Sequence, residues 1–283
     1  MTEVPQPLIA VTGATGRLGG RVARRLAEAG ARQRLVVRQP DRAPVLPGCD
    51  IARAAYHDGA AVAEALAGVD TVFMVSGAES ARRVEEHRTF IDAAVAAGVR
   101  RLVYTSFYGA APDATFTLAR DHWHTEEHLK ASGLAWTVLR DNLYLDVLPL
   151  FADDEGVLRG PAGQGRVAAV AIDDIADVAT AVLREPGRHD GQTYDLTGPQ
   201  ALTLTQVAEI VTLVTGRQLR YHPETEAEAY ASRARYQAPD WQVEAWVSTY
   251  LAIGSGELAT PTDAVRRLTG VDPLTLEDLL RLG

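Results

Sequence analysis

The sequence VTGATGRLGG, residues 11–20, lies between a short apolar run and a stretch with helical periodicity. Gly13 permits a tight turn, Gly16 lets the backbone approach a pyrophosphate, and Gly19 allows close packing of the helix. The N–H groups at the helix N-terminus would bind the phosphates. The spacing predicts a dinucleotide-binding turn made by Gly13, Thr15, Gly16, Arg17, Leu18 and Gly19. The alternative is a glycine-rich turn without a ligand.

The first 140 residues repeat one unit, in which an apolar run is followed by a turn and a helical stretch. The expected strands are residues 8–12, 34–38, 51–56, 71–76, 101–106 and 135–140, and the expected helices are residues 18–30, 59–67, 81–98 and 118–133. Strands that alternate with helices of this length form parallel βαβ units, and continuous apolar runs suit strands that helices cover on both faces. We therefore expect an α/β fold with a Rossmann-type doubly wound parallel sheet.

The pattern is less regular beyond residue 140. A loop rich in Gly and Pro at 156–165, strands at 167–171 and 193–197, and helices at 174–184 and 203–215 precede a broken helical pattern at 221–283. We expect a Rossmann domain over residues 1–150, whose sheet is completed by strands from residues 165–200, and a smaller, mostly helical, discontinuous C-terminal substrate lobe over residues 151–283. Its aromatic residues form either the core of the lobe or a surface for a flat ligand: Tyr230, Tyr236, Trp241, Trp246 and Tyr250.

Composition excludes several classes of protein. The chain has 283 residues, of which 47% are hydrophobic and 23% charged, as in an ordinary globular protein. A net charge of −9 without runs of like charge argues against binding to nucleic acid, and no apolar stretch is long enough to span a membrane. Cys49 is the single cysteine, and the start Met1-Thr2-Glu3-Val4-Pro5 does not resemble a signal peptide, so we expect a cytoplasmic protein.

The end of the expected second strand indicates which dinucleotide is bound. A carboxylate about 20 residues after the glycines would hold the ribose 2′-hydroxyl of NAD, but none occupies that position. Arg38 stands there instead, where it can hold a 2′-phosphate, and Arg17 would supply a second positive charge. The sequence therefore predicts NADPH (NADP) as the cofactor. A solvated arginine at the strand end is the alternative for Arg38.

Loop residues after the third and fourth expected strands are further candidates for the cofactor site. By position alone, Tyr56, His57 and Asp58 would border the adenine, and Ser76 and Gly77 would border the pyrophosphate and nicotinamide ribose. All five have the alternative interpretation of ordinary loop residues.

Several segments together point to a family. They are residues 11–20, 102–106, 122–129, 132–134, 139–144, 173–176 and 256–258. The sequence resembles the NmrA-like group of atypical short-chain dehydrogenases/reductases, and within it the bacterial NADPH:quinone reductases and triphenylmethane-dye reductases. The resemblance covers nearly the whole chain. It implies a Rossmann fold, bound NADPH and the reduction of quinone-like or dye-like acceptors.

The usual catalytic pair of the wider superfamily is absent from the sequence. Its members use Tyr-x-x-x-Lys, whereas Lys130, the single lysine, is preceded at that spacing by Glu126. Alcohol-dehydrogenase or epimerase chemistry is therefore not expected. A quinone becomes a hydroquinone anion on taking up hydride and needs only a modest proton donor, for which a histidine titrates in the right range. His122, where the resemblance places a basic residue, is assigned as a donor or orienting group; a surface histidine is the alternative.

Four more residues are candidates for the reaction site. Thr105 and Ser106 end the fifth expected strand beside the expected nicotinamide, and Ser106 is a catalytic candidate. Tyr144 would contact substrate or nicotinamide, and Asn142 would hydrogen-bond the carboxamide or substrate; the alternative for both is a structural role. Leu143 stands where the family usually carries an aromatic residue, which leaves the substrate open.

His124 and His128 fit the spacing H-x-x-E-H of some zinc sites, but the segment lies in an expected crossover helix, so no metal is predicted. We expect an NADPH-dependent oxidoreductase that transfers hydride to a small aromatic or conjugated carbonyl substrate such as a quinone or dye. The alternative is a non-catalytic NADP(H)-binding redox sensor of the NmrA-like type. The sequence leaves the physiological substrate and the oligomeric state open.

Overall fold

The computed structural model describes residues 7–282, so the segment Met1–Pro5 discussed above lies outside the described residues. Two compact units are present. The first consists of residues 7–106, 121–139 and 175–194, and the second of residues 107–120, 140–174 and 195–282. This division differs from the single boundary expected near residue 150, because segments that follow several different strands, rather than the C-terminal half alone, build the second unit.

The first unit is built on a seven-stranded sheet with the order β3-β2-β1-β4-β5-β6-β9. The strands are β1 (Ile9–Thr12), β2 (Gln33–Val37), β3 (Cys49–Arg53), β4 (Thr71–Met74), β5 (Arg101–Phe107), β6 (Ala135–Asp141) and β9 (Gln192–Leu196). The pairs β1–β2, β1–β4, β2–β3 and β4–β5 are parallel. The order of the first six strands is that of a dinucleotide-binding Rossmann sheet, which confirms the expected fold class.

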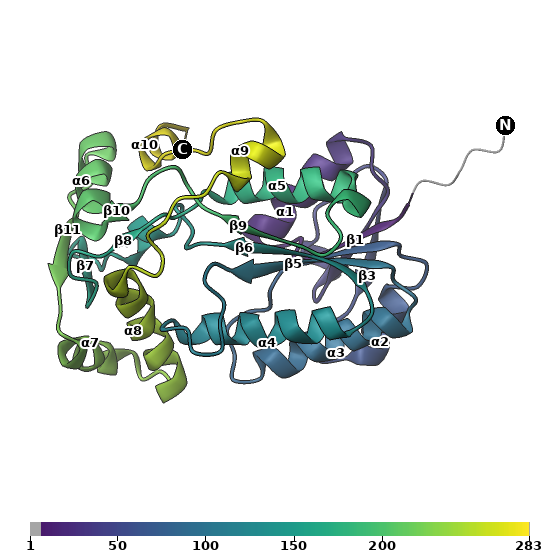
Figure 1. Cartoon of the computed structure of the whole chain (residues 1–283), viewed down its shortest axis with the longest axis horizontal. Helices are drawn as coiled ribbons and strands as arrows, with labels where there is room; N and C mark the ends of the chain where they lie inside the picture. Colours follow the sequence, from purple (N-terminus) through teal and green to yellow (C-terminus); the bar gives the residue numbers. More distant parts are fainter. Residues whose placement is uncertain (1–6, 283) are drawn as a thin grey trace. The chain divides into compact units, whose positions relative to one another are not determined.

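Helices cover both faces of this sheet. They are α1 (Arg17–Glu28), α2 (Gly59–Ala65), α3 (Arg83–Ala96), α4 (Thr117–Ala131) and α5 (Ile172–Arg184), with the short 3₁₀ turns η1 (Pro40–Arg42) and η3 (Pro186–Arg188). Helices α2, α3 and α4 lie along one face and α1 and α5 along the other (Figure 1). Every residue of β1 and β4 is buried, as the continuous apolar runs predict for strands with two covered faces.

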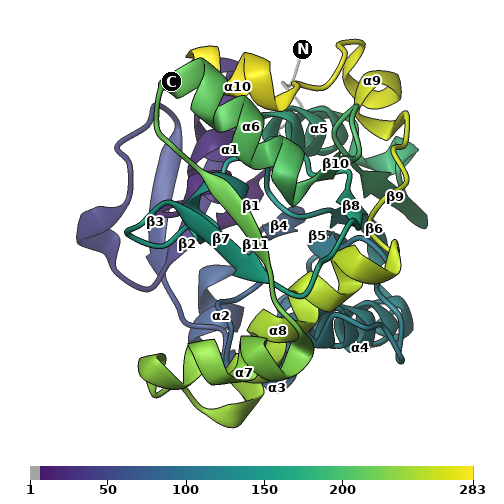
Figure 2. The same ribbon diagram turned by 90° about the vertical axis from the view of Figure 1, so that its left-hand side faces the viewer.

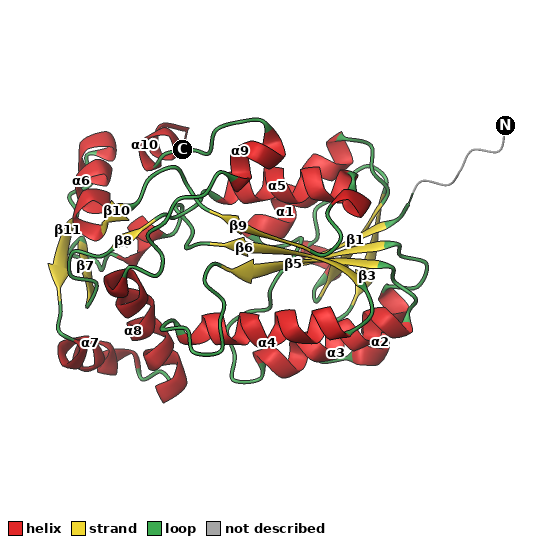
Figure 3. Ribbon diagram, viewed as in Figure 1, coloured by secondary structure: helices red, strands yellow, loops and turns green. Residues whose placement is uncertain are grey.

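The second unit is mostly helical (Figure 3). Its helices are α6 (Leu204–Thr215), α7 (Glu226–Arg233), α8 (Asp240–Ser255), α9 (Ala264–Thr269) and α10 (Leu276–Leu282), with 3₁₀ turns η2 (Leu148–Phe151) and η4 (Ala234–Tyr236). Its strands are β7 (Val157–Gly160), β8 (Arg166–Val167), β10 (Leu202–Thr203) and β11 (Arg220–Pro223). Strand β8 pairs with β10, and β7 pairs in parallel with β11, as Figure 2 shows face on.

One expected strand of the large sheet forms differently. The run predicted at residues 167–171 contributes only the end of β8, and β9 alone of the two candidates joins the seven-stranded sheet. The reason is that Ala168 N–H donates to Leu258 O and Val170 N–H donates to Leu143 O, so loop segments take up the hydrogen bonds of this run. Within residues 7–282, no helix is long and apolar enough to cross a membrane.

Candidate active site

The glycine turn between β1 and α1 has the geometry that its sequence predicts. Gly13 has a left-handed φ of +64°, and Gly16 N–H donates to Gly13 O at 2.8 Å. A Cβ atom at position 19 would lie only 2.4 Å from Gly13 O, so α1 packs this closely against the turn only because Gly19 has no side chain. A glycine is therefore suited to each of the three positions for a different structural reason.

The same turn presents a surface suited to a phosphate group. Gly16 is the N-cap of α1, where no side chain caps the helix and no acidic residue occupies the first turn. A Cβ atom on Gly16 would lie 3.2 Å from Gly13 O and meet no other atom within 4 Å, so apart from this one tight contact the backbone is not covered on that side. Gly13, Thr15, Gly16 and Arg17 are exposed, whereas Leu18 is buried and anchors the helix. Uncapped N–H groups at an exposed helix N-terminus fit the pyrophosphate of a dinucleotide.

Tyr56, which is predicted to border the adenine, connects the strand ends beside this turn through hydrogen bonds. Tyr56 Oη donates to Val75 O at 2.6 Å and accepts from Thr12 Oγ1 at 2.6 Å, while Val75 N–H donates to Thr12 Oγ1. Burial raises the pKa of Tyr56, and the positive charge of Arg38 acts in the opposite direction, so this guanidinium lies near the cluster. Arg38 itself is exposed directly after β2.

The two neighbours of Tyr56 have different roles. Asp58 caps α2, because its carboxylate accepts from Ala61 N–H at 3.0 Å, and His57 is exposed in the preceding turn. Asp58 therefore caps a helix, and its predicted place beside the adenine stays a prediction.

The structure brings three predicted residues together at the ends of β4 and β5. Ser76 N–H donates to Thr105 Oγ1 at 2.8 Å, which fixes the segment after β4 against β5. Gly77 N–H donates to His87 Nε2 at 2.8 Å, so helix α3 holds the same segment from its other side.

His122 is buried, with 5% of its surface exposed, so its alternative interpretation as a surface histidine is wrong. The nitrogen Nη2 of Arg83 lies 3.0 Å from His122 Nε2. Because a guanidinium only donates, Nε2 must accept, and Nδ1–H then donates to Tyr104 Oη at 2.9 Å. Both ring nitrogens are occupied, which supports the orienting role for His122 rather than the role of proton donor.

His87 completes this buried cluster. Thr125 Oγ1 donates to Asp121 O, so it accepts from His87 Nδ1–H at 2.9 Å, while His87 Nε2 accepts from Gly77. Burial and then the nearby charge of Arg83 lower the pKa of His87 to about 3. The ring is therefore neutral at neutral pH, as its two hydrogen bonds require.

Ser106 has a structural partner. Its hydroxyl donates to Glu126 Oε1 at 2.6 Å, and both residues are buried between β5 and α4. Lys130 Nζ lies 3.3 Å from the other oxygen of Glu126 and 2.9 Å from Glu127. The single lysine thus contacts glutamates, and Ser106 anchors a helix to the sheet. The catalytic role predicted for Ser106 stays a prediction.

Asn142 and Tyr144 belong to the second unit. Asn142 is 1% exposed, its amide nitrogen donates to Leu258 O at 3.0 Å, and its amide oxygen accepts from Leu143 N–H at 2.8 Å. Because its amide forms hydrogen bonds through both nitrogen and oxygen, Asn142 stabilises a loop of this unit, and its predicted hydrogen bond to the carboxamide or substrate stays a prediction. Tyr144 is half-buried, and its backbone forms a bridge with Val170.

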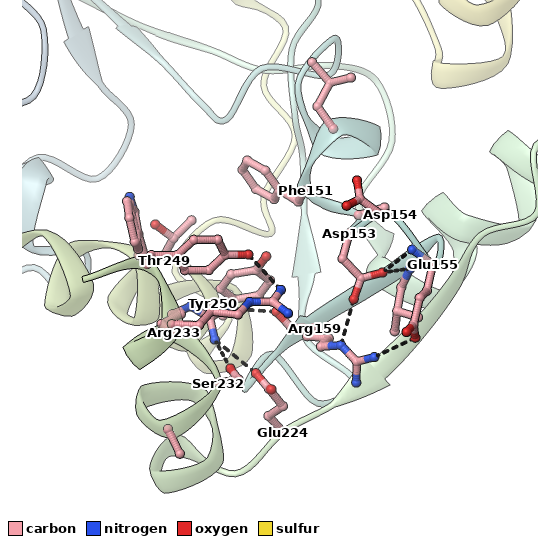
Figure 4. Close-up of a pocket in the computed structure, with 17 residues that line it drawn as sticks. Phe151, Asp153, Asp154, Glu155, Arg159, Glu224, Ser232, Arg233, Thr249 and Tyr250 are labelled. Carbon is pink, nitrogen blue, oxygen red and sulfur yellow. Dashed lines mark hydrogen bonds and ion pairs between the residues drawn. The ribbon is translucent and has the colours of Figure 1, made fainter. Parts of the chain in front are cut away.

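The second unit contains a cavity of about 1160 Å³ (Figure 4). Two ion pairs lie in its lining: Arg233 contacts Glu224 at 3.0 Å, and Arg159 contacts Asp153 at 2.9 Å. Arg233 also lies over the ring of Tyr250. The aromatic residues that line the cavity are Phe151, Tyr236, Trp246 and Tyr250. Three of the five predicted aromatic residues therefore line a cavity, whereas Tyr230 and Trp241 do not.

The H-x-x-E-H segment has other contacts. His128 Nε2 lies 2.7 Å from Asp92 Oδ1, and the ring of His124 packs on Trp123. Among residues 7–282, no three His, Cys, Asp or Glu side chains are grouped so as to hold a metal ion.

Sequence reasoning missed Arg83, His87 and Tyr104. The only signal was the run of polar residues Tyr104, Thr105 and Ser106 in a buried strand, since buried polar side chains need partners on neighbouring elements. The spacing of Arg83 and His87 on α3 places both on one helix face.

Comparison with known proteins agrees with this site. A family model described as NAD(P)H-binding matches residues 13–186. Quinone oxidoreductase 2 of Escherichia coli is 34% identical over 278 residues, 96% of each chain. The NAD(P)H azoreductase of Xenophilus azovorans is 32% identical over 268 residues, 93% of each chain.

Solved structures give the same result. The E. coli NADPH-dependent quinone oxidoreductase complexed with NADPH has a TM-score of 0.87 at 33% identity, covering 97% of this chain and 99% of that chain. The triphenylmethane reductase of Citrobacter sp. complexed with NADP(H) has a TM-score of 0.84 at 28% identity, with the same coverage. The resemblance found in the sequence is confirmed, and the chain belongs to the NAD(P)H-binding family.

Proposed function

We propose that this chain is an NADPH-dependent oxidoreductase that transfers hydride to a quinone, a dye or a similar conjugated carbonyl acceptor. The observation that carries the proposal is the open, uncapped glycine turn at the N-terminus of α1, which fits a dinucleotide. NADPH, when bound, would supply the hydride. The relatives named as quinone, azo-compound and triphenylmethane reductases support this class of acceptor.

The preference for NADPH over NADH rests on charge. Arg38 follows β2 directly and is exposed, as is Arg17 in the glycine turn. Val37, the last residue of β2, is apolar, so no carboxylate at this strand end competes with a 2′-phosphate. Two arginines near one phosphate favour the phosphorylated cofactor.

The choice of acceptor rests on the absence of a tyrosine–lysine pair. Lys130 is engaged by Glu126 and Glu127, and His122 is held between Arg83 and Tyr104. Lys130 and His122 are therefore engaged with neighbouring side chains, and neither forms the tyrosine–lysine pair that supplies a proton in ordinary short-chain dehydrogenases. Acceptors that become stabilised anions on taking up hydride suit such a site, because water can protonate them afterwards.

The test is consumption of NADPH with a panel of acceptors: quinones, an azo dye, a triphenylmethane dye and a simple ketone. A second assay follows formation of NADPH from NADP⁺ and an alcohol. We expect turnover with the conjugated acceptors and none with the ketone or the alcohol. A variant Gly16→Val serves as the control for contaminating reductases, because it removes the cofactor site. Tight binding of NADPH and NADP⁺ without turnover of any acceptor would contradict the proposal and support the redox-sensor alternative.

A further inference from the structure

Arg83 at the start of α3 is a buried cation without a direct counter-ion. Only 6% of its surface is exposed. Its Nη2 donates to His122 Nε2, and its Nε is closed off from solvent with no hydrogen-bond partner in the described part of the chain. Within residues 7–282 no carboxylate forms an ion pair with it. An arginine stays protonated at any physiological pH, so the charge cannot be relieved by losing a proton.

The groups around Arg83 form no ion pair with it in the described part of the chain. His87 is neutral, and His122 offers an uncharged acceptor nitrogen. Asp121 on α4 is close enough to interact with the charge of Arg83, and burial raises the pKa of this carboxyl group. Glu85 and Glu86 in the first turn of α3 oppose the positive partial charge of the helix N-terminus. A buried cation without a direct ion pair is costly, and an anion that joins it would offset this cost.

We propose that Arg83 binds the oxygen atom of the acceptor that becomes negatively charged when hydride arrives. This inference rests on the proposed function and names the group that stabilises its product. A quinone takes up two electrons and one hydrogen as hydride from the reduced nicotinamide, which becomes oxidised. The quinone becomes a hydroquinone monoanion, its oxygen meets the guanidinium, and water then supplies the second proton.

His122 is the positioning residue for this interaction. Its ring is fixed by the hydrogen bond to Tyr104, and its Nε2 in turn fixes one nitrogen of the Arg83 guanidinium. The planar guanidinium carries five donors in a fixed geometry, and because Nε is closed off from solvent, we assign the remaining N–H groups of Nη1 and Nη2 to the oxygen ligand. This arrangement stabilises negative charge without a proton donor, in agreement with the missing tyrosine–lysine pair.

The test measures binding of a phenolate that resembles the product. 4-Nitrophenol exists as phenol and coloured phenolate near neutral pH, so its absorbance reports which form the protein binds. We expect the wild-type protein to bind the phenolate about ten- to a hundred-fold more tightly than nitrobenzene, its neutral analogue. Arg83→Met should remove this preference, and Arg83→Lys should keep part of it, because lysine retains the charge but not the planar fork. Arg82→Met is the matched control, since Arg82 pairs with Glu85 on the surface.

Each other outcome overturns the inference. Equal phenolate binding by the wild type and Arg83→Met would show that the ligand does not reach this charge. If Arg83→Met fails to fold, unchanged phenolate binding by Arg83→Lys would lead to the same conclusion. The titration is repeated with saturating NADP⁺. Loss of NADP⁺ affinity in Arg83→Met with no change in phenolate binding would place Arg83 in the cofactor site.

The inference and the proposed function fail in different ways. Reduction of quinones by Arg83→Met at the wild-type rate would contradict the role of Arg83 and leave the reductase activity intact. Phenolate binding that depends on Arg83, in a protein that reduces no acceptor, would support the anion site and contradict the proposed function.

Discussion

At the scale of single residues, we expect Arg38 to determine the preference for NADPH over NADH. Arg38 stands at the strand end where a carboxylate would favour NAD, and its exposed guanidinium is available to a 2′-phosphate. A charge-assisted hydrogen bond of this kind contributes about 1.5 to 3 kcal/mol. The preference therefore depends on one side chain that a single substitution can remove.

Arg38→Ala should weaken NADPH binding by about ten- to a hundred-fold and leave NADH binding nearly unchanged. Isothermal titration with both cofactors measures the two dissociation constants. Arg42→Ala is a suitable control, because Arg42 is an exposed arginine of η1 that bonds Gln39. Equal losses for NADPH and NADH would show that Arg38 does not recognise the 2′-phosphate.

His87, which accepts a hydrogen bond from Gly77, makes the stability of the fold depend on pH in the acid range. Because its pKa is lowered from 6.5 to about 3, the unfolded chain binds a proton at a pH where the folded chain does not. The folded state therefore loses stability as the pH falls from 6.5 towards 3, by at most about 1.4 kcal/mol per pH unit from this residue.

His87→Gln should flatten this dependence, because its amide oxygen still accepts from Gly77 N–H but does not titrate. Urea unfolding at several pH values between 4 and 7 gives the slope, and His57→Gln, an exposed histidine, should leave it unchanged. A slope for His87→Gln equal to that of the wild type would mean that this histidine is protonated in the folded protein.

At the level of elements, the turn between β1 and α1 joins one strand and one helix through glycines with different functions. Gly19 is required by packing, because a Cβ atom there would collide with Gly13 O, whereas a Cβ atom on Gly16 would make one tight contact of 3.2 Å with Gly13 O and meet no other atom within 4 Å. Substitutions at these two positions should therefore separate folding from cofactor binding.

Gly19→Ala should lower the melting temperature by several degrees and weaken NADPH, since α1 must move away from the turn. Gly16→Val should abolish NADPH binding with little change in circular dichroism, because its side chain occupies the space for the phosphate. Gly59→Ala in the first turn of α2 is the control, as its Cβ atom would make an ordinary contact with Thr89. Intact NADPH affinity in Gly16→Val would exclude this turn as the binding site.

The sequence predicts the elements of this turn well because their signals are local. Glycine spacing, apolar runs and helix stops within some 15 residues indicate the strands of the sheet and the first helix. The cluster of Arg83, His87, Tyr104 and His122 could not be predicted in this way. Its members come from α3, β5 and α4, and each alone resembles an ordinary helix or strand residue. The prediction of a strand of the large sheet at residues 167–171 was wrong for a similar reason, since the pairing partner of β8 is β10, which lies far away in the sequence.

At the scale of the whole molecule, the chain consists of two compact units with different candidate sites. The first contains the glycine turn, Arg38 and the Arg83–His122 cluster. The second contains a cavity lined by aromatic residues and by two ion pairs. Aromatic side chains in a cavity favour a flat ligand that can stack on them.

The most direct test of the reductase proposal is a single-turnover experiment. Protein mixed with one equivalent of NADPH is combined with excess quinone, and the loss of nicotinamide absorbance is followed for NADPH and for NADPH deuterated at the transferred position. We predict complete oxidation in one turnover, with a slower rate for the deuterated cofactor, and a much slower reaction with NADH at the same concentration. Bound NADPH that stays reduced in the presence of every quinone and dye would contradict the proposal.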